Sequence, residues 1–555
     1  MSLITVRIGE NDMKFNSGIT LEEILEYDEI KLNLDYPVTL ALVDNNLREL
    51  RYRLEHDCEV KFIDISDKDG RRTYMRSLTF LFIRAIEELY PNSNVKIQHS
   101  LSNGFYCEVD SSKKFTILDV NKVENRMRDF IDQDEKIIRF KTSKKDAIDI
   151  YKKQNRVGKA DLLKYKNTED LHLYRCGWLE DYFYGYMVPS SNMLKVFSLR
   201  LYNEGIVLLG PDIKNPKTVT KFIHQPNLFK IYKEAKSWAD VLSIPNAASL
   251  NDAIENGSIP EVIRLAEAYH EKKICDISNM INNDKEKGKL ILIAGPSSSG
   301  KTSFAQRLKL QLMVNKMRPV SISVDDYFVN REDTPLDEFG EKDYESVYAI
   351  DLNTFNEDLE KLISGYEINL PTFNFKTGAR EYTKDKRISI EENQPIIIEG
   401  IHGLNPVLTQ SIPEGNKFKI YISALTQLNL DEHNKISTTD IRLIRRIVRD
   451  FEHRSYTAND TIRMWKSVNR GEEKNIFPFQ ENSDIMFNSA LIYEIGVLKK
   501  YVEPLLNKIS IKDEEYREAK RLLKFLQYFL SIDDESDIPN TSLLREFIGG
   551  SKIVH

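Results

Sequence analysis

The sequence predicts an α/β protein whose C-terminal half contains a parallel β-sheet and whose N-terminal half holds two smaller α+β units. Residues 290–294 are a short continuous apolar run, as expected of a buried parallel strand. The octet Gly295–Thr302 then fills the pattern G-x-x-x-x-G-K-[ST], and apolar residues recur at helical spacing through 304–312. Two further apolar runs, 319–324 and 395–398, lead into acidic residues. This pattern is typical of an open α/β sheet.

The first unit is predicted over residues 1–66. Residues 3–9 alternate like a strand, and 12–15 are expected to return as its hairpin partner. Thr20–Glu23 reads as a capping box, so we expect a helix to begin there. Residues 38–43 and 59–63 are further strand candidates. Several strands with one helix in so short a stretch indicate a small α+β domain.

Three more segments complete the predicted organisation. An α+β unit over 67–225 starts with a helix at 78–89 and continues as strand, turn and strand through 95–109. Residues 226–288 read mostly as helix, and 289–555 form the unit with the parallel sheet, which includes a late amphipathic helix at 513–531.

Composition narrows the functional class. The chain has 555 residues, 41% hydrophobic and 30% charged, with a formal net charge of −7, so a general nucleic-acid footprint is not indicated. Four scattered cysteines without a C-x-x-C pair indicate neither a disulfide framework nor a common zinc spacing. Without a basic-then-apolar leader or a long apolar run, we expect a cytoplasmic protein with no membrane segment.

The glycine loop predicts a phosphate-binding site. Gly295 and Gly300 allow backbone N–H groups to converge on phosphate oxygens, and the following helix adds its positive end. Lys301 supplies a cation for the β- and γ-phosphates, and the Thr302 hydroxyl is a ligand for Mg²⁺. We therefore expect ATP and Mg²⁺ as cofactors. The expected nucleotide-binding residues are Gly295, Pro296, Ser297, Ser298, Ser299, Gly300, Lys301, Thr302 and Ser303.

Acidic and basic side chains accompany this loop. Asp325 follows the 319–324 run, where a carboxylate can take a proton from an attacking hydroxyl or hold Mg²⁺, and Glu399 ends the run beginning at 395. Arg442, Arg445 and Arg449 fall on one face of a predicted helix. Because guanidinium groups suit phosphate oxygens, we prefer a phosphate-clamping lid to the alternative, a solvated salt-bridged surface.

The segments from Leu290 to about Leu498 resemble the uridine kinase and phosphoribulokinase family. The matching motifs follow the family's order: the phosphate loop, Val324–Phe328, Asp343 with Tyr348–Asp351, Leu370–Phe375, Ile398–Ile401 and the arginine helix. The resemblance implies a kinase with Asp325 as catalytic base, Lys301, Arg442, Arg445 and Arg449 as further catalytic residues, and Thr302 and Glu399 near Mg²⁺. It implies an acceptor site containing Asp325, Tyr327, Phe328, Phe373, Arg380 and Arg445.

Two positions depart from the pyrimidine kinases of that family. Those enzymes carry a tyrosine and a histidine around the Pro-Thr-Phe stretch, where this chain has Phe373 and Gly378. Phenylalanine stacks but donates no hydrogen bond, and glycine has no side chain. The chemistry of a kinase is retained, whereas uridine or cytidine as acceptor is not indicated by these residues.

The N-terminal half carries a second resemblance. Residues 1–66 are similar to the TGS domain, a ubiquitin-like β-grasp module of threonyl-tRNA synthetases and some GTPases. Residues 67–225, with Gly104–Tyr106 and Cys176–Gly177, look like the second domain of threonyl- and alanyl-tRNA synthetases. The metal-binding histidines of the editing reaction are missing there, so we expect neither bound zinc nor editing.

The leading prediction is therefore an ATP- and Mg²⁺-dependent kinase of a small molecule, with a nucleoside 5′-hydroxyl as acceptor. Another hydroxyl compound, pantothenate- or ribulose-phosphate-like, is the alternative within that class. A nucleotide-switched regulator that contacts RNA through residues 1–225 is the alternative outside it. The sequence does not indicate the oligomeric state.

Overall fold

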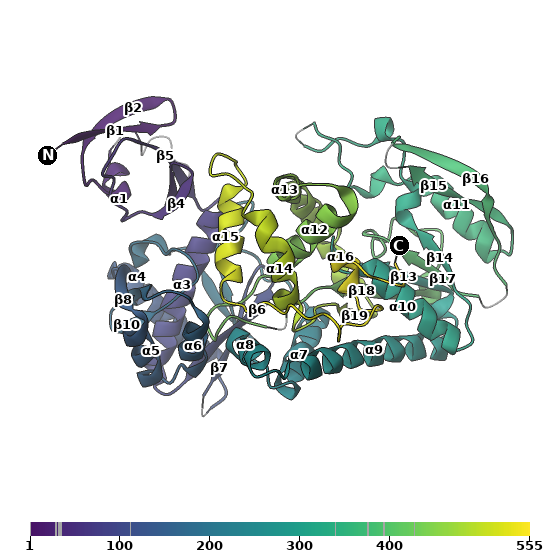
Figure 1. Ribbon diagram of the computed structural model, residues 1–555, viewed down its shortest axis with the longest axis horizontal. Helices are drawn as coiled ribbons and strands as arrows, with labels where there is room; N and C mark the ends of the chain where they lie inside the picture. Colours follow the sequence, from purple (N-terminus) through teal and green to yellow (C-terminus); the bar gives the residue numbers. More distant parts are fainter. Residues whose placement is uncertain are drawn as a thin grey trace.

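A computed structural model describes residues 2–27, 30, 36–111, 113–338, 340–374, 377–391, 394–426 and 428–554. Figure 1 shows an elongated molecule with the N-terminal strands at one end and the parallel sheet at the other. The long helix α9 (Ile259–Asn283) runs along one side of the half that holds the parallel sheet. No helix in these ranges is both long and apolar enough to cross a membrane.

The first unit is a five-stranded mixed sheet with the order β2-β1-β5-β3-β4. β1 pairs in parallel with β5, and the remaining pairs are antiparallel, which together with helix α1 is the β-grasp arrangement expected from the sequence. The capping box is confirmed, since the Glu23 amide donates to Thr20 Oγ1 at 3.1 Å. The elements are β1 (Leu3–Ile8), β2 (Asn11–Asn16), α1 (Leu21–Ile24), β3 (Val38–Val43), β4 (Asn46–Glu49) and β5 (Cys58–Asp64).

The second unit packs its first helix, α3 (Lys68–Leu89), against two antiparallel sheets with the orders β11-β12-β7-β6 and β10-β9-β8. The helix starts ten residues before the predicted 78. Its polar first turns are held by partners elsewhere in the chain, such as Glu518 for Arg72 at 3.3 Å. The other elements are β6 (Asn94–Leu101), β7 (Gly104–Asp110), α4 (Ile117–Asp132), β8 (Ile138–Ser143), α5 (Lys144–Lys153), α6 (Val157–Leu162), β9 (Asp170–Cys176), β10 (Leu179–Asp181), β11 (Ser198–Tyr202) and β12 (Gly205–Leu209).

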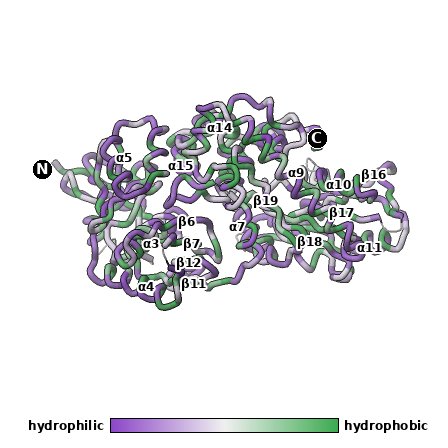
Figure 2. The backbone as a smooth tube through the Cα atoms, turned by 90° about the horizontal axis from the view of Figure 1, so that it is seen from below, coloured by the Kyte–Doolittle hydropathy of each residue, from purple (hydrophilic) through white to green (hydrophobic). Residues whose placement is uncertain are grey.

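Helices α7 (Pro226–Val241), α8 (Ala247–Glu255) and α9 follow, as the sequence predicted for residues 226–288. The chain then enters a five-stranded sheet with the order β14-β17-β13-β18-β19, in which every pair is parallel. Figure 2 shows three strands of this one sheet, β17, β18 and β19. The strands of the sheet are β13 (Leu290–Ala294), β14 (Val320–Ser323), β17 (Ile396–Glu399), β18 (Lys417–Ser423) and β19 (Ile485–Asn488).

One prediction about this sheet is wrong in part. The run at 319–324 was expected to be a buried strand, but β14 is an edge strand in which Ser321 is exposed and only Ile322 is buried. An edge strand is covered on one face only, so polar serines alternate with apolar residues there. Strands β18 and β19 carry polar or short apolar stretches and were not predicted.

Helices and a hairpin surround this sheet. The amphipathic helix expected at 513–531 is the shorter α15, which leaves the kinase-like unit and lies beside β4 and α3 (Figure 1). Its Lys520 donates to Asn46 Oδ1 at 2.7 Å. The elements are α10 (Lys301–Val314), α11 (Leu352–Ile363), the hairpin β15 (Ile368–Asn374) and β16 (Ala379–Ile388), α12 (Thr438–Arg454), α13 (Ala458–Asn475), α14 (Glu494–Leu506), α15 (Tyr516–Leu526) and α16 (Arg545–Ile548).

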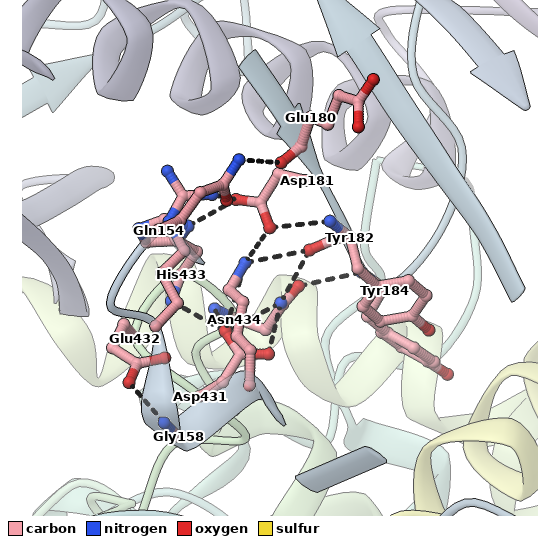
Figure 3. A network of polar contacts seen from close by, with 12 residues as sticks. Gln154, Gly158, Glu180, Asp181, Tyr182, Tyr184, Asp431, Glu432, His433 and Asn434 are labelled. Carbon is pink, nitrogen blue, oxygen red and sulfur yellow. Dashed lines mark hydrogen bonds and ion pairs between the residues drawn. The ribbon is translucent and has the colours of Figure 1, made fainter. Parts of the chain in front are cut away.

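A buried polar network joins the second unit to the loop before α12 (Figure 3). The Asp181 carboxylate at the end of β10 accepts from Lys159 and lies 2.6 Å from His433 Nδ1. The side-chain oxygen of Asn434 accepts from the Tyr184 amide at 2.9 Å. The contacts of His433 and Asn434 join segments about 250 residues apart, so they fix the two units against each other.

Candidate active site

Three strand ends meet at one edge of the parallel sheet. The phosphate loop follows β13, Glu399 ends the neighbouring β17, and Asp325 follows β14 on the far side of β17. The Thr302 hydroxyl donates to Glu399 Oε2 at 3.5 Å. The adjacency of β13, β17 and β14 therefore brings together the loop and the two acids that the sequence singled out.

The electrostatics of these acids are coupled. Burial raises the pKa of Glu399 to about 7, and the neighbouring charge of Asp325 adds to the rise while Lys301 opposes it. The Asp325 side chain is accessible to solvent, but the protein surrounding it still raises its pKa, mainly by desolvation. A carboxylate with a raised pKa binds a proton more readily, as a general base near neutral pH requires.

The phosphate loop has the geometry of an anion site. A Cβ on Gly295 would lie 2.0 Å from the Ile422 carbonyl oxygen, so the loop approaches β18 in a way that only glycine permits. The Ser298 and Ser299 hydroxyls are buried and have no hydrogen-bond partner among the residues that the structure describes. Lys301 at the start of α10 donates to the Pro296 carbonyl at 3.3 Å. Unpartnered hydroxyls and a cation around a helix N-terminus fit a bound phosphate group.

Two carboxylates from distant helices also contact this loop, and no sequence motif points to either. Glu472 on α13 accepts from the Ser297 amide at 2.8 Å. Glu546 on α16 accepts from the Ser303 hydroxyl at 2.6 Å and from its amide at 3.2 Å. Both occupy N–H groups of the kind that a phosphate loop offers to a nucleotide.

The oxygens around Thr302 fit Mg²⁺. A hydroxyl and a carboxylate are the hard ligands that this ion prefers, and it keeps waters and substrate phosphates as its other ligands. Within the described ranges, no group of three or more His, Cys, Asp or Glu side chains is placed to hold a metal ion. Thr302 and Glu399 are the residues that would hold it.

The arginine helix is α12, and its arginines lie differently from the predicted lid. Arg442 and Arg445 are buried, in ion pairs with Glu472 and Glu494. Arg442 Nε also donates to the Ser297 carbonyl at 3.0 Å. These two arginines therefore support the phosphate loop from the protein interior. They do not fit a closing lid, because closure would have to break their buried ion pairs.

The neighbouring arginines of α12 are more accessible. Arg446 donates to the Ser297 hydroxyl at 2.8 Å and pairs with Asp450 at 3.1 Å. Arg449 pairs with the same carboxylate at 3.0 Å and keeps 15% of its side chain exposed, and Arg454 keeps 51%. These three arginines share the single carboxylate of Asp450, so they retain positive charge toward the loop.

The residues expected on the acceptor side lie on the β15–β16 hairpin and in the segment after β14. Phe373 and Phe328 contact edge to face with ring centroids 5.5 Å apart, and the Phe373 amide donates to Asp326 at 3.2 Å. Arg380 pairs with Asp351 at 2.8 Å. Phe375, part of the same motif, lies outside the described residues.

Tyr327 lies elsewhere than the resemblance implied, and Gly378 lies in a tight turn. Tyr327 is buried, packs on Phe355 and donates to Asp358 at 3.0 Å, so it belongs to the core beneath the site. Gly378 has φ +72° in the hairpin turn, and a Cβ there would lie 2.8 Å from Arg331. Side chains are strained in that conformation, so a histidine here would carry backbone strain and would have to displace the Arg331 side chain.

One further acid was missed. Glu345 lies in the loop before α11, and burial raises its pKa to about 7, with the nearby charges of Glu472 and Asp325 contributing and Arg446 and Lys301 opposing. Its position depends on a long loop without periodicity, which is why no sequence pattern identified it.

Cys176 and His99 of the second unit are both in contact with neighbouring side chains. The Cys176 thiol accepts from the Arg84 guanidinium at 3.2 Å. The ring of His99 stacks on Tyr232 with centroids 3.7 Å apart, and burial lowers the pKa of this histidine to about 3. Both side chains are therefore engaged in packing.

Comparisons with known proteins match two parts of the chain. Residues 290–495 match the model of the phosphoribulokinase / uridine kinase family. The N-terminal region matches threonine–tRNA ligases: that of Acetivibrio thermocellus is 29% identical over 200 residues, and that of Paraburkholderia phytofirmans 32% over 199. Each match covers 36% of this chain, which spans only 31% of those relatives. The solved structure of a possible uridine kinase from Bacillus stearothermophilus is 18% identical, with a TM-score of 0.27, and the match covers 39% of this chain and 98% of that one.

Residues 290–495 are thus a P-loop kinase domain. More particularly, they are a domain of the phosphoribulokinase / uridine kinase family, joined to an N-terminal region related to threonine–tRNA ligases.

Proposed function

We propose that the protein is an ATP- and Mg²⁺-dependent kinase that phosphorylates a hydroxyl group of a small molecule, in the first place the 5′-hydroxyl of a nucleoside. One observation carries the proposal. The phosphate loop, the Thr302–Glu399 pair and Asp325 lie together on three adjacent strands within the family domain. Phosphoryl transfer needs little beyond such positioning and charge stabilisation.

Each residue then has a role. The loop amides and Lys301 neutralise the phosphates, and Thr302 and Glu399 would hold Mg²⁺, which supplies charge neutralisation when bound. Asp325 accepts the proton of the acceptor hydroxyl. Arg446, Arg449 and Arg454 replace Arg442 and Arg445 as the arginines proposed to meet the transferring group, since these three share one carboxylate.

The acceptor is proposed from the aromatic side of the site. The Phe328–Phe373 pair offers apolar ring faces to a nucleobase, but no hydroxyl that would select uridine. A site of this kind discriminates by roughly 10–200-fold rather than by ~10⁴. We therefore propose broad nucleoside selectivity, with another hydroxyl compound as the alternative acceptor.

The N-terminal region supports a second candidate. Residues 1–66 are proposed as a TGS-like domain and 67–225 as a synthetase-like domain, because this region matches threonine–tRNA ligases. A regulator that contacts RNA and uses nucleotide binding as a switch would keep the phosphate loop but have no use for a general base.

The test is ATP consumption by the full chain with a panel of nucleosides, pantothenate and sugar phosphates. The proposal expects turnover that depends on one class of acceptor and on Mg²⁺. Tight ATP binding without acceptor-dependent turnover would favour the regulator.

A further inference from the structure

The first unit, the second unit and the C-terminal unit meet around a cavity of about 370 Å³. This cavity is separate from the phosphate loop. Its walls come from the β3–β4 turn, α3, the loop after β10, the segment leading into α12, and α15. Figure 1 shows α15 lying beside β4 and α3 at this junction. The cavity exists only because the three parts are docked together.

The charge of this cavity is strongly unbalanced. Among the described residues that line it, eight are arginine or lysine and two are aspartate, Asp69 and Asp440. His433 also lines it, and burial lowers its pKa to about 4, so it is neutral at pH 7. The cations are Arg48, Arg72, Arg76, Lys435, Arg517, Lys520, Arg521 and Lys524.

Three of these cations are neutralised within the protein. Arg521 makes a two-pronged pair with Asp440, at 2.7 and 2.8 Å, and also pairs with Glu518 at 2.8 Å. Arg72 shares both of these carboxylates, and Arg517 pairs with Asp69 at 3.0 Å. The carboxylates near the cavity are therefore already paired with these three arginines.

The other five cations make no ion pair with any residue that the structure describes. Arg76 donates only to the Tyr186 carbonyl, at 2.6 Å, and Lys435 only to the Ser100 hydroxyl, at 2.8 Å. Lys520 donates to an amide oxygen, and Lys524 faces the ring of Tyr184. Desolvation lowers the pKa of Arg76 to about 10 and of Lys435 and Lys524 to about 8. Arg48, Arg76 and Lys435 are half-buried, whereas Lys520 and Lys524 are exposed, so at least the first three gain from a bound anion.

Aromatic side chains lie among these cations. Lys435 lies over the Phe105 ring at 4.6 Å, and the lining also includes rings from the loop after β10 and from α15. Such rings accept a flat apolar group, while the cations accept negative charge. The ring-bearing residues are Phe105, Phe183, Tyr184, Tyr186 and Phe525.

We propose that this cavity binds a small molecule with two or more phosphate groups, of which a nucleotide with a stacked base is the form that uses the whole lining. The charge imbalance sets the need for several negative charges, since one phosphate would leave most of the five cations unpaired. The cavity volume of about 370 Å³ falls within the range of small-molecule sites, and RNA is a larger ligand than it would enclose.

The site is tested with the full-length protein by calorimetric titration of tripolyphosphate, with ATP as a second probe. Wild type is expected to show two sites, the phosphate loop and the cavity. Lys301→Ala removes the first. Arg76→Met combined with Lys435→Met removes the second, with affinity for that site reduced roughly tenfold or more. Lys145→Met, which changes an exposed lysine on α5, is the matched control and is expected to retain both sites.

A second variant keeps the test valid if the double variant fails to fold. Lys524→Met changes an exposed side chain and is expected to weaken the cavity site alone, with an unchanged unfolding temperature. One site in wild type that Lys301→Ala abolishes would overturn the proposal. A folded Lys524→Met or Arg76→Met/Lys435→Met protein that keeps both sites at wild-type affinity would do the same. So would binding of transfer RNA, but not of tripolyphosphate or ATP, that depends on these cations.

Discussion

At the scale of single residues, the account depends most on Asp325. Asp325→Asn keeps the shape of the side chain but removes its ability to accept a proton. We expect kcat to fall by ~10² or more while Mg²⁺-ATP affinity is retained, the usual scale for a general base. Steady-state kinetics with the true acceptor, together with calorimetry of ATP binding, measures both effects.

Asp333→Asn is the control for that variant, because Asp333 is an exposed aspartate eight residues further along the same segment. It should leave kcat unchanged. Near-normal turnover in Asp325→Asn would remove Asp325 from the catalytic role.

Two variants of α12 distinguish an arginine that supports the phosphate loop from one that acts in catalysis. Arg445→Ala leaves Glu494 buried without its partner, and breaking a buried pair costs about 3–5 kcal/mol. We therefore expect its unfolding temperature to fall by roughly 5 °C or more. Arg449→Ala should leave that temperature nearly unchanged and lower kcat. Calorimetry and kinetics on both variants check the split, and equal loss of stability in the two would assign all of α12 to structure.

Glu345 predicts a dependence of stability on pH. Burial raises its pKa from 4.5 in the unfolded chain to about 7 in the folded protein, so the folded state binds the proton more tightly. Stability from this group is present below pH 4.5 and is lost as the pH rises to 7. Glu345→Gln, uncharged throughout, should become more stable relative to wild type over that interval. Unfolding free energies from denaturant titrations at several pH values test this, and a constant difference would contradict it.

The residues of the site were predictable only in part. The phosphate loop, Asp325 and Glu399 follow apolar strand runs, so a local pattern places them at one sheet edge. Glu472 and Glu546 reach the same loop from 175 and 243 residues away, and they carry no motif. For the same reason, the burial of Arg442 and Arg445 could not be predicted, because their partners lie on other helices.

At the scale of elements, the β15–β16 hairpin is the part expected to shape the acceptor site. Gly378→Ala forces a side chain into a left-handed turn and against Arg331, whereas Gly365→Ala meets the same backbone strain, at φ +79°, in open space. Each substitution should cost about 1–2 kcal/mol of strain. Only Gly378→Ala should also raise KM for the acceptor, and similar kinetics for the two variants would separate the hairpin from acceptor binding.

Element prediction succeeded where the pattern was local. Strands with continuous apolar runs and the Thr20 capping box agree with the structure. The early start of α3 and the mixed exposure of β14 escaped prediction, because charged first turns are held by α15 in one case and an edge position exposes serines in the other.

At the scale of the whole molecule, the network around Asp181 holds the second unit to the kinase domain (Figure 3). Asp181→Ala leaves Lys159 buried without its closest anion and should destabilise the chain by about 3–5 kcal/mol. Asp170→Ala removes an exposed pair with Lys141 and should cost less than about 1 kcal/mol. Equal effects of the two changes would show that the network does not hold the units together.

This junction should also loosen in acid. Burial lowers the pKa of His433 from 6.5 to about 4, so the stability it contributes is present above pH 6.5 and is lost as the pH falls toward 4. The lysine and arginine side chains beside Asp181 lower the pKa of its carboxyl group, so this group takes up a proton only at lower pH. Small-angle scattering from pH 7 to pH 4 should show an increase in dimensions, and an unchanged radius of gyration with both units folded would contradict it.

How the units pack against each other could not be predicted from the sequence. Composition and motifs separate the N-terminal region from the kinase domain, but the contacts between them join side chains hundreds of residues apart. The basic cavity at their junction therefore had no counterpart among the sequence predictions.

The central claim is that the chain transfers a phosphoryl group from ATP to an acceptor hydroxyl. Mass spectrometry of an acceptor mixture containing nucleosides, pantothenate and sugar phosphates, incubated with Mg²⁺-ATP, tests it most directly. The account predicts one class of acceptor, nucleosides first, that gains a phosphoryl group with wild type and not with Lys301→Ala. ATP bound by wild type, with no phosphorylated product from any acceptor, would contradict it.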